Sequence, residues 1–240
     1  MHRFYIEKTD GDKVTLTDAE QVHHIRDVLR LKAGDAIIVF DRAGREYKAA
    51  IAAIGKKVEL NLVPVIVRRS NNTRLTMACA IPKAGRMDDI IDYLTQLGVE
   101  RIIPMLTDRV MVKLDHAVMQ ARLLRWLKIA QCAAQQCQRN NIPVISPVTD
   151  FKDVVKNSQD FDLKLIPHLS GKRRLIKNVL SKGSHRNIIV LIGPEGDFTP
   201  EEVSLALHNG FIPVSLGDTV LRVATAAVAV ASYIKFALYK

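Results

Sequence analysis

The sequence predicts an α/β protein in which a small β-barrel module precedes a mostly parallel sheet with helices on both faces. Residues 1–70 hold several short strand patterns and one helix pattern, which is typical of a small barrel. From residue 74 onward, apolar strand patterns alternate with helix patterns. Because these strands are apolar along their whole length, both faces of the sheet should be buried.

The barrel strands are predicted from short runs rich in β-branched and aromatic residues. These runs cover residues 4–7, 35–40, 46–54 and 58–67. A helix is expected over residues 17–30, where Thr17 and Glu20 have the spacing of a capping box. Its apolar stripe consists of Val22, Ile25, Val28 and Leu29. The polar segment Arg68–Arg74 then predicts a boundary between domains 1–70 and 74–240.

The second domain begins with a buried-strand pattern and ends with a helix. The predicted strands are residues 75–81, 101–106, 162–167, 187–192 and 211–216. The predicted helices are residues 87–98, which Gly98 ends, 116–139, a stretch between the last two strands, and 222–240. The final helix is apolar nearly all round, so it should be buried, either in the core or against a second subunit.

The charge of the chain favours an anionic partner. It has 35 Lys and Arg against 25 Asp and Glu, a net charge of +10, which suits nucleic acid or an acidic membrane surface. Residues 163–186 carry seven basic residues and no acidic one. Arg26 and Arg30, four residues apart, should share one helix face. Separate basic concentrations suit a phosphate backbone followed over a long path.

Several kinds of chemistry and location are not favoured by the sequence. It has no P-loop, no Rossmann glycine fingerprint and no nucleophile elbow. It also has no Cys and His cluster with zinc-ligand spacing, so no metal is expected.

The location of the protein is predicted from its cysteines and its apolar segments. Three cysteines form no disulfide framework, which favours a reducing compartment. The first residues lack a signal-peptide pattern, and the apolar run Val223–Ile234 is too short to span a bilayer. These observations predict a cytoplasmic protein.

Three loops follow predicted strands of the second domain and contain Gly or Pro. They are residues 166–171, 192–197 and 216–222. Ligands of parallel sheets bind beyond the carboxyl ends of the strands, so these loops could form one pocket. Such a pocket would contact an adenine or an amino-acid moiety through the main chain. The alternative is that they are ordinary strand-to-helix turns.

Several short motifs, in this order and at these distances, resemble those of bacterial 16S ribosomal RNA (uracil-N3)-methyltransferases of the SPOUT superfamily. In the first domain they are Met1-His2-Arg3-Phe4 and the stretch from His24 to Arg30. In the second they are Leu97-Gly98-Val99, Pro104, Arg109, Gln136-Cys137-Gln138-Arg139, Pro143, Ile192–Gly196 and Leu216–Thr225. The resemblance covers nearly the whole chain.

The resemblance implies a PUA-like RNA-binding β-barrel, a SPOUT domain with a trefoil knot, and a homodimer. It implies S-adenosyl-L-methionine as the cofactor and 16S rRNA of the small ribosomal subunit as the substrate. The cofactor contacts would be Pro167, His168, Ile192, Gly193, Pro194, Glu195, Gly196, Leu216, Gly217, Val220, Leu221 and Arg222. Arg222 and Glu195 would be catalytic. The RNA contacts would be Arg3, Arg26, Arg30, Arg109 and Arg139.

The sequence departs from the family pattern at four positions. Gln96, Gln135 and Ala224 stand where the family often has Glu, and Asp197 stands where it usually has Gly. Two alternatives therefore stay open beside methylation of uridine N3. One is a SPOUT methyltransferase that acts on another rRNA nucleotide. The other is a catalytically impaired rRNA-binding factor in ribosome assembly.

Overall fold

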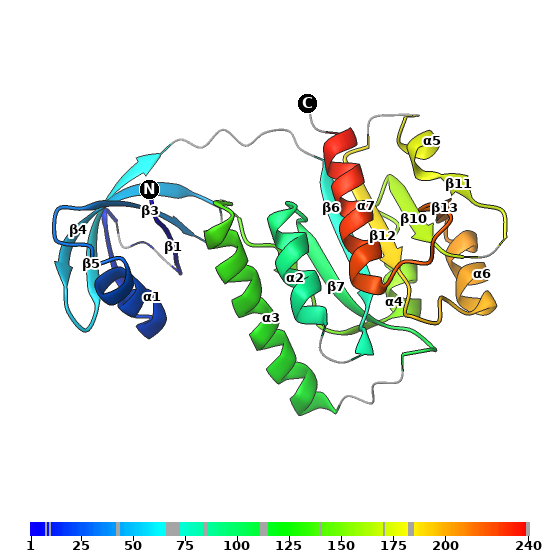
Figure 1. Ribbon diagram of the computed structural model, residues 1–240, viewed down its shortest axis with the longest axis horizontal. Coiled ribbons are helices and arrows are strands. Elements are labelled where there is room, and N and C mark those ends of the chain that lie inside the picture. Colours follow the sequence, from blue (N-terminus) through cyan, green and yellow to red (C-terminus); the bar gives the residue numbers. More distant parts are fainter. Residues whose placement is uncertain are drawn as a thin grey trace. The chain divides into compact units, whose positions relative to one another are not determined.

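The computed structural model describes residues 1–7, 9, 11–41, 44–65, 73–83, 86–110, 115–139, 141–169, 171–181 and 185–238 (Figure 1). The chain forms two compact units. The first contains Met1–Ser70 with Ala134–Ile142, and the second contains Asn71–Ala133 with Pro143–Lys240. Most of the predicted boundary segment Arg68–Arg74 lies outside the described residues. Each unit is described by itself.

The first unit is built on a five-stranded sheet in the order β1-β3-β4-β5-β2. Its strands are β1 (Arg3–Ile6), β2 (Lys13–Leu16), β3 (Ala36–Asp41), β4 (Glu46–Ile54) and β5 (Val58–Val65). The β1–β3 pair is parallel and the other pairs are antiparallel. Alternate residues of β2 and β4 are buried, so one face of this curled sheet packs on a core.

The helix of the first unit differs from the prediction at both ends. Helix α1 (Ala19–His23) begins after Asp18, whose carboxylate accepts a hydrogen bond from Gln21 N, so the predicted capping box of Thr17 and Glu20 is wrong. The chain continues as a π-helical turn, η1 (His24–Val28). Arg30 lies beyond this turn with φ 53°, so Arg26 and Arg30 do not share a helix face. Val28, predicted in the apolar stripe, is 57% exposed.

The second unit contains an eight-stranded sheet in which every described strand pair is parallel. Its order is β11-β13-β10-β12-β6-β7-β8, and β9 also pairs with β7. The strands are β6 (Arg74–Ala80), β7 (Arg101–Leu106), β8 (Val144–Ile145), β9 (Thr149–Asp150), β10 (Leu163–Pro167), β11 (Arg174–Leu175), β12 (Asn187–Ile192) and β13 (Ile212–Ser215). The predicted mostly parallel sheet is confirmed.

Helices cover both faces of this sheet (Figure 1). The covering helices are α2 (Met87–Gln96), α4 (Phe151–Lys156), α6 (Pro200–His208) and α7 (Val223–Ala237). The chain also forms α3 (His116–Gln136), whose last three residues belong to the first unit, and α5 (Ile176–Leu180), which follows β11. Helices α4 and α6 pack on one face, in a core with Ile189 and Leu191 of β12. Neighbouring residues of a strand point to opposite faces, so Ile188 and Val190 face the other layer, where α7 packs on β6 and β12 and against α2.

Helix α7 is buried along one side only. Val223, Ala227, Val230, Ala231 and Ile234 are buried, whereas Tyr233 is 41% and Phe236 75% exposed. The alternative in which the core of one chain buries this helix therefore holds for one side only, and burial of the other side against a second subunit stays a prediction. Within the described residues, no helix combines the length and the apolar character needed to cross a membrane.

Candidate functional site

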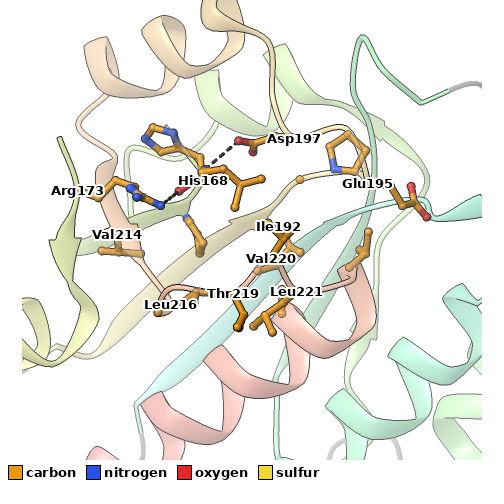
Figure 2. A pocket seen from close by; sticks show the side chains of 17 residues that line it. His168, Arg173, Ile192, Glu195, Asp197, Val214, Leu216, Thr219, Val220 and Leu221 are labelled. Atoms are coloured by element: carbon orange, nitrogen blue, oxygen red, sulfur yellow. Dashed lines mark hydrogen bonds between the residues drawn. The ribbon is translucent and has the colours of Figure 1, made fainter. Parts of the chain in front are cut away.

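The three loops singled out in the sequence lie side by side at one edge of the parallel sheet. They follow β10, β12 and β13, and β10 pairs in parallel with both β12 and β13. The carboxyl ends of three neighbouring strands therefore point the same way, and their loops line one cavity (Figure 2). The three loops are therefore more than ordinary strand-to-helix turns, because residues from each of them line the same cavity.

Most of the predicted cofactor contacts line this cavity. They are Pro167, His168, Ile192, Gly193, Pro194, Glu195, Leu216, Gly217, Val220 and Leu221. Gly196 and Arg222 do not line it. The structure adds residues that were not among the predicted contacts: Leu169, Arg173, Asp197, Val214, Thr219, Val223 and Ala226. Ala226 follows Val223 by three residues on α7, so the helical period was the signal that could have found it.

The loop after β12 turns sharply against the core. The Asp197 N–H donates to Pro194 O at 3.0 Å, which closes the turn. A Cβ atom at Gly193 would lie 3.0 Å from Cε2 of Phe198, a buried ring that packs against Phe151. Glycine at position 193 therefore lets the backbone approach the core closely enough to form the cavity wall.

Neighbouring segments hold the same loop from three sides. Lys83 N, after β6, donates to Glu195 Oε1 at 3.3 Å. The Arg109 guanidinium, after β7, donates to the carbonyl oxygen of Gly196. Leu169 N, after β10, donates to Asp197 Oδ2 at 2.8 Å, as the dashed line in Figure 2 shows. Arg109, a predicted RNA contact, thus lies against the backbone of a cavity loop.

His168 is a buried titratable group on the cavity wall, 9% exposed. Burial lowers the pKa of its imidazole, the Asp197 charge opposes this shift, and the Arg173 charge reinforces it. Arg173 Nη1 donates to the His168 carbonyl oxygen at 3.0 Å (Figure 2). His168 is therefore held in the neutral form more firmly than an exposed histidine would be.

The third loop leads into α7. Gly217 has φ 122°, a backbone conformation that residues with a Cβ rarely adopt, and its N–H donates to Ser215 Oγ at 3.3 Å. Arg222 is the N-cap residue of α7 and its side chain is exposed. It stands between Leu221 and Val223, which both line the cavity. Arg222 therefore lies at the rim of the cavity rather than in its wall.

The other predicted RNA contacts belong to the first unit. Arg3 Nη2 donates to Glu46 Oε2 at 2.6 Å, and its side chain is 10% exposed. Arg26 donates to both oxygens of Asp27 at 2.9 and 2.8 Å and remains exposed. The hydrogen bond from Arg26 is the main cause that lowers the pKa of Asp27 to about 2. Arg30 is exposed and Arg139 is half-buried.

The described residues include no cluster of three or more His, Cys, Asp or Glu side chains that could hold a metal ion. The site consists of loop backbone, apolar side chains, the carboxylates of Glu195 and Asp197, the Arg173 guanidinium and the His168 ring. The apolar groups include Ile192, Val214 and Leu221. This combination suits an organic ligand with a flat apolar part and several polar or charged groups.

Comparisons with known proteins identify relatives along nearly the whole chain. Residues 69–235 match the model of an RNA methyltransferase domain, and residues 16–60 match that of an RNA methyltransferase PUA domain. The Ribosomal RNA small subunit methyltransferase E of Bacillus subtilis is 30% identical over 98% of this chain and 96% of its own length. The protein of the same name from Synechocystis is 34% identical over 89% of this chain and 69% of its own length.

A solved structure agrees with the computed one. A Ribosomal RNA small subunit methyltransferase E from Neisseria gonorrhoeae, bound to S-adenosyl methionine, superposes with a TM-score of 0.86 at 26% identity. The match covers 98% of this chain and 97% of that one. The structural match therefore includes both units of this chain and is not limited to the unit that carries the cavity.

Proposed function

This chain belongs to the RNA methyltransferase family, and we propose that it transfers a methyl group from S-adenosyl-L-methionine to N3 of a uridine in 16S rRNA of the small ribosomal subunit. The observation that carries the proposal is the single cavity formed by the loops after β10, β12 and β13. Relatives named for small-subunit rRNA methylation support the choice of substrate. An rRNA substrate also implies action in the cytoplasm.

The residues of the cavity fit S-adenosyl-L-methionine. Ile192, Val214 and Leu221 offer apolar surface to an adenine ring, and the loop backbones offer polar groups to its edge. The Glu195 carboxylate offers negative charge to the ammonium and sulfonium groups. When bound, this cofactor supplies a methyl group on a positively charged sulfur atom.

The chain must also manage the proton and the charge of the uracil. N3 of a neutral uracil carries a proton that must leave as the new N–C bond forms, and the base becomes a better nucleophile as it does so. Arg222, exposed at the rim, is proposed to stabilise the negative charge that develops on the uracil. The exposed Glu195 carboxylate is proposed to accept the departing proton.

The substrate face of the second unit is proposed to include a basic surface beside the cavity. Residues 171–181 carry four basic residues and no acidic one, and Lys172, Arg174 and Lys177 are exposed. Strand β11, which contains Arg174, pairs with β13 just before the third cavity loop. Because N3 lies on the Watson–Crick edge, the target base must be unpaired, and exposed cations can hold the phosphates on either side of it.

The assignment of 1–70 as a PUA-like RNA-binding domain and 74–240 as the methyltransferase domain is part of the same proposal. The exposed Arg26 and Arg30 are retained as RNA contacts of the first unit, together with Arg139. Arg3 is not retained, because its guanidinium is committed to Glu46 and its side chain is almost fully covered.

A homodimer is proposed from the open side of α7, the side with Tyr233 and Phe236 that this chain does not bury. Phe236 and Tyr233 expose 75% and 41% of their surface on this helix. Tyr93, 47% exposed, lies on α2, which packs against α7. Large apolar side chains on two adjoining helices form the kind of surface that a second copy of a chain covers.

The test is methyl transfer from labelled S-adenosyl-L-methionine to small ribosomal subunits that lack their own methylation, with the product nucleoside identified by mass spectrometry. N3-methyluridine is the expected product. Another methylated nucleoside would keep the enzyme class and overturn the specificity. RNA binding without any transfer would favour an impaired assembly factor, and Ala224→Glu would then test whether the missing carboxylate is the cause.

Arg222→Ala separates the proposed role of this residue from cofactor binding. Because Arg222 does not line the cavity, the affinity for S-adenosyl-L-methionine should stay within about twofold. Turnover should fall by two orders of magnitude or more if the guanidinium stabilises charge in the transition state, on the scale of about 10²–10³ for one lost oxyanion donor. Unchanged turnover would remove Arg222 from the mechanism.

A further inference from the structure

We propose that Asp197 is a positioning residue whose carboxylate holds the loop after β10 against the loop after β12, and so sets the shape of the cofactor cavity. The inference rests on the proposed function for the identity of the ligand. It concerns a position where this sequence departs from the pattern of the family it resembles. Asp197 is argued to act through the Leu169 backbone and not on the reacting atoms.

The backbone at Asp197 is in a conformation that favours glycine. Its φ is 60°, in the left-handed region, where Asn and Asp are the residues most often tolerated after Gly. The turn itself needs no side chain, because it is closed by the Asp197 N–H and Pro194 O at 3.0 Å. An aspartate here therefore costs more backbone energy than a glycine would, and its side chain should supply a compensating interaction.

That interaction is the hydrogen bond from Leu169 N to Asp197 Oδ2 at 2.8 Å. Its partners are 28 residues apart in sequence and lie on two different walls of one cavity. Hydrogen bonds from a backbone N–H to a carboxylate are stronger than those between neutral groups. In Figure 2 the Asp197 carboxylate points across to the first loop, and the contact bridges the two walls.

The two ends of this bridge are supported differently. On the Asp197 side, Arg109 donates to the Gly196 carbonyl and Lys83 N donates to Glu195, so the loop after β12 is fixed from β6 and β7. On the other side, the loop continues into Gly171, with φ 75°, and Arg173 donates to the His168 carbonyl. The hydrogen bond from Leu169 to Asp197 therefore fixes the loop after β10 relative to the loop after β12, which has more supporting contacts.

Three variants test this role. Asp197→Gly removes the acceptor and suits φ 60°, so the backbone itself gains no strain. Asp197→Asn keeps an acceptor oxygen and a residue type that tolerates the left-handed region, but it removes the charge. Asp218→Asn is the matched control, because it removes one negative charge from an exposed side chain that does not line the cavity, without adding a glycine to the third loop.

The first readout needs no cofactor. Hydrogen exchange of the Leu169 amide, followed by NMR in the apo protein, should become at least about tenfold faster in Asp197→Gly, since a hydrogen bond to a charged group is lost. The exchange should accelerate by a smaller factor in Asp197→Asn, which keeps a neutral acceptor, and should change little in Asp218→Asn. Unchanged exchange in Asp197→Gly would overturn the proposal, as would a loss in Asp197→Asn equal to that in Asp197→Gly.

The second readout is affinity for S-adenosyl-L-methionine by calorimetry, with kinetics on the rRNA substrate. In Asp197→Gly we expect Kd and the KM for the cofactor to rise roughly five- to tenfold with a smaller change in kcat, and Asp197→Asn should restore most of the affinity. Normal affinity in Asp197→Gly would overturn the positioning role. A wild-type protein that does not bind this cofactor would instead contradict the proposed function, while the exchange experiment still tests the bridge.

Discussion

The Glu202 carboxylate joins the start of α6 to the end of β7 by accepting a hydrogen bond from Asp108 N at 2.9 Å. Its other oxygen accepts from Thr199 N at 2.8 Å, and Thr199 Oγ1 accepts from Glu202 N, which completes a capping box. Glu202 is 3% exposed. One buried side chain therefore satisfies two backbone donors, one from each segment.

Replacing Glu202 should destabilise the second unit. Glu202→Ala leaves both donors without their partner, so we expect a loss of roughly 1–3 kcal/mol in the free energy of unfolding. Glu202→Gln keeps one acceptor and should lose less. Chemical denaturation measures both, with Glu201→Ala as the control, since Glu201 is an exposed neighbour on the same helix turn. Equal losses in the two alanine variants would contradict this account.

Gly193→Ala should damage the cavity through the core. The new methyl group would lie 3.0 and 3.1 Å from two carbons of the Phe198 ring, so the ring or the loop must move. Overpacking of this kind costs about 1–3 kcal/mol. Thermal unfolding should show the loss. Gly55→Ala is the control, because a Cβ atom there meets open space. The prediction fails if the two variants melt alike.

His168 should make stability depend on pH on the acid side. Burial holds the pKa of His168 below its ordinary value of 6.5, so the unfolded chain takes up a proton at a higher pH than the folded protein does. Stability contributed by the neutral ring is therefore present above about pH 6.5 and declines as the pH falls from there toward the lowered folded-state pKa. Denaturation of wild type and His168→Gln at pH 7.5 and 5.5 checks this. The difference in the free energy of unfolding between pH 7.5 and pH 5.5 should be smaller in His168→Gln than in the wild type.

The basic surface beside the cavity should contribute to RNA binding through phosphates. Lys172→Gln combined with Arg174→Gln should weaken binding and reduce the slope of log K against log salt by about 1–2. Lys152→Gln combined with Lys156→Gln removes the same charge from exposed positions on α4, where Asp153 lies between them. Fluorescence anisotropy over a salt series distinguishes the pairs. An equal change in the slope of log K against log salt for the two double variants would show only an effect of net charge.

The open side of α7 yields a prediction about association. Phe236→Glu should shift a dimer toward monomer, because a charge would be buried in an apolar contact. Light scattering coupled to size-exclusion chromatography gives the mass. Leu207→Glu is the control, since Leu207 is 43% exposed on α6, on the other face of the sheet. A monomeric wild type would contradict the proposed dimer directly.

Much of the fold could be predicted because its strands carry strong local patterns. The run 187–192 is apolar at nearly every residue, and β12 spans Asn187–Ile192. Weak patterns were missed. Strand β2 has only four residues, with Val14 and Leu16 alone pointing inward, and α4 and α5 are short. A trefoil knot is a property of the path of the whole chain, so no local sequence pattern can encode one, and for this chain it is implied by the family resemblance.

The candidate site could be predicted as loops but not as contacts. Loops at the carboxyl ends of parallel strands must share an edge, so their meeting follows from strand type and order. The hydrogen bond between Leu169 and Asp197 links residues 28 positions apart, and no spacing rule predicts it. Likewise, the charge pattern could not show that Arg3 faces Glu46 and that Arg109 supports a loop carbonyl.

The order of the strands has a consequence for how the chain is made. Every residue that lines the cavity lies from Pro167 to Ala226, whereas strands β6 and β7 are complete by Leu106. During translation the cavity walls therefore follow these two strands by on the order of ten seconds. Until then the apolar strands lack the cover of α6 and α7. A ligand that binds in this cavity can only recognise a chain that has been synthesised at least as far as Ala226.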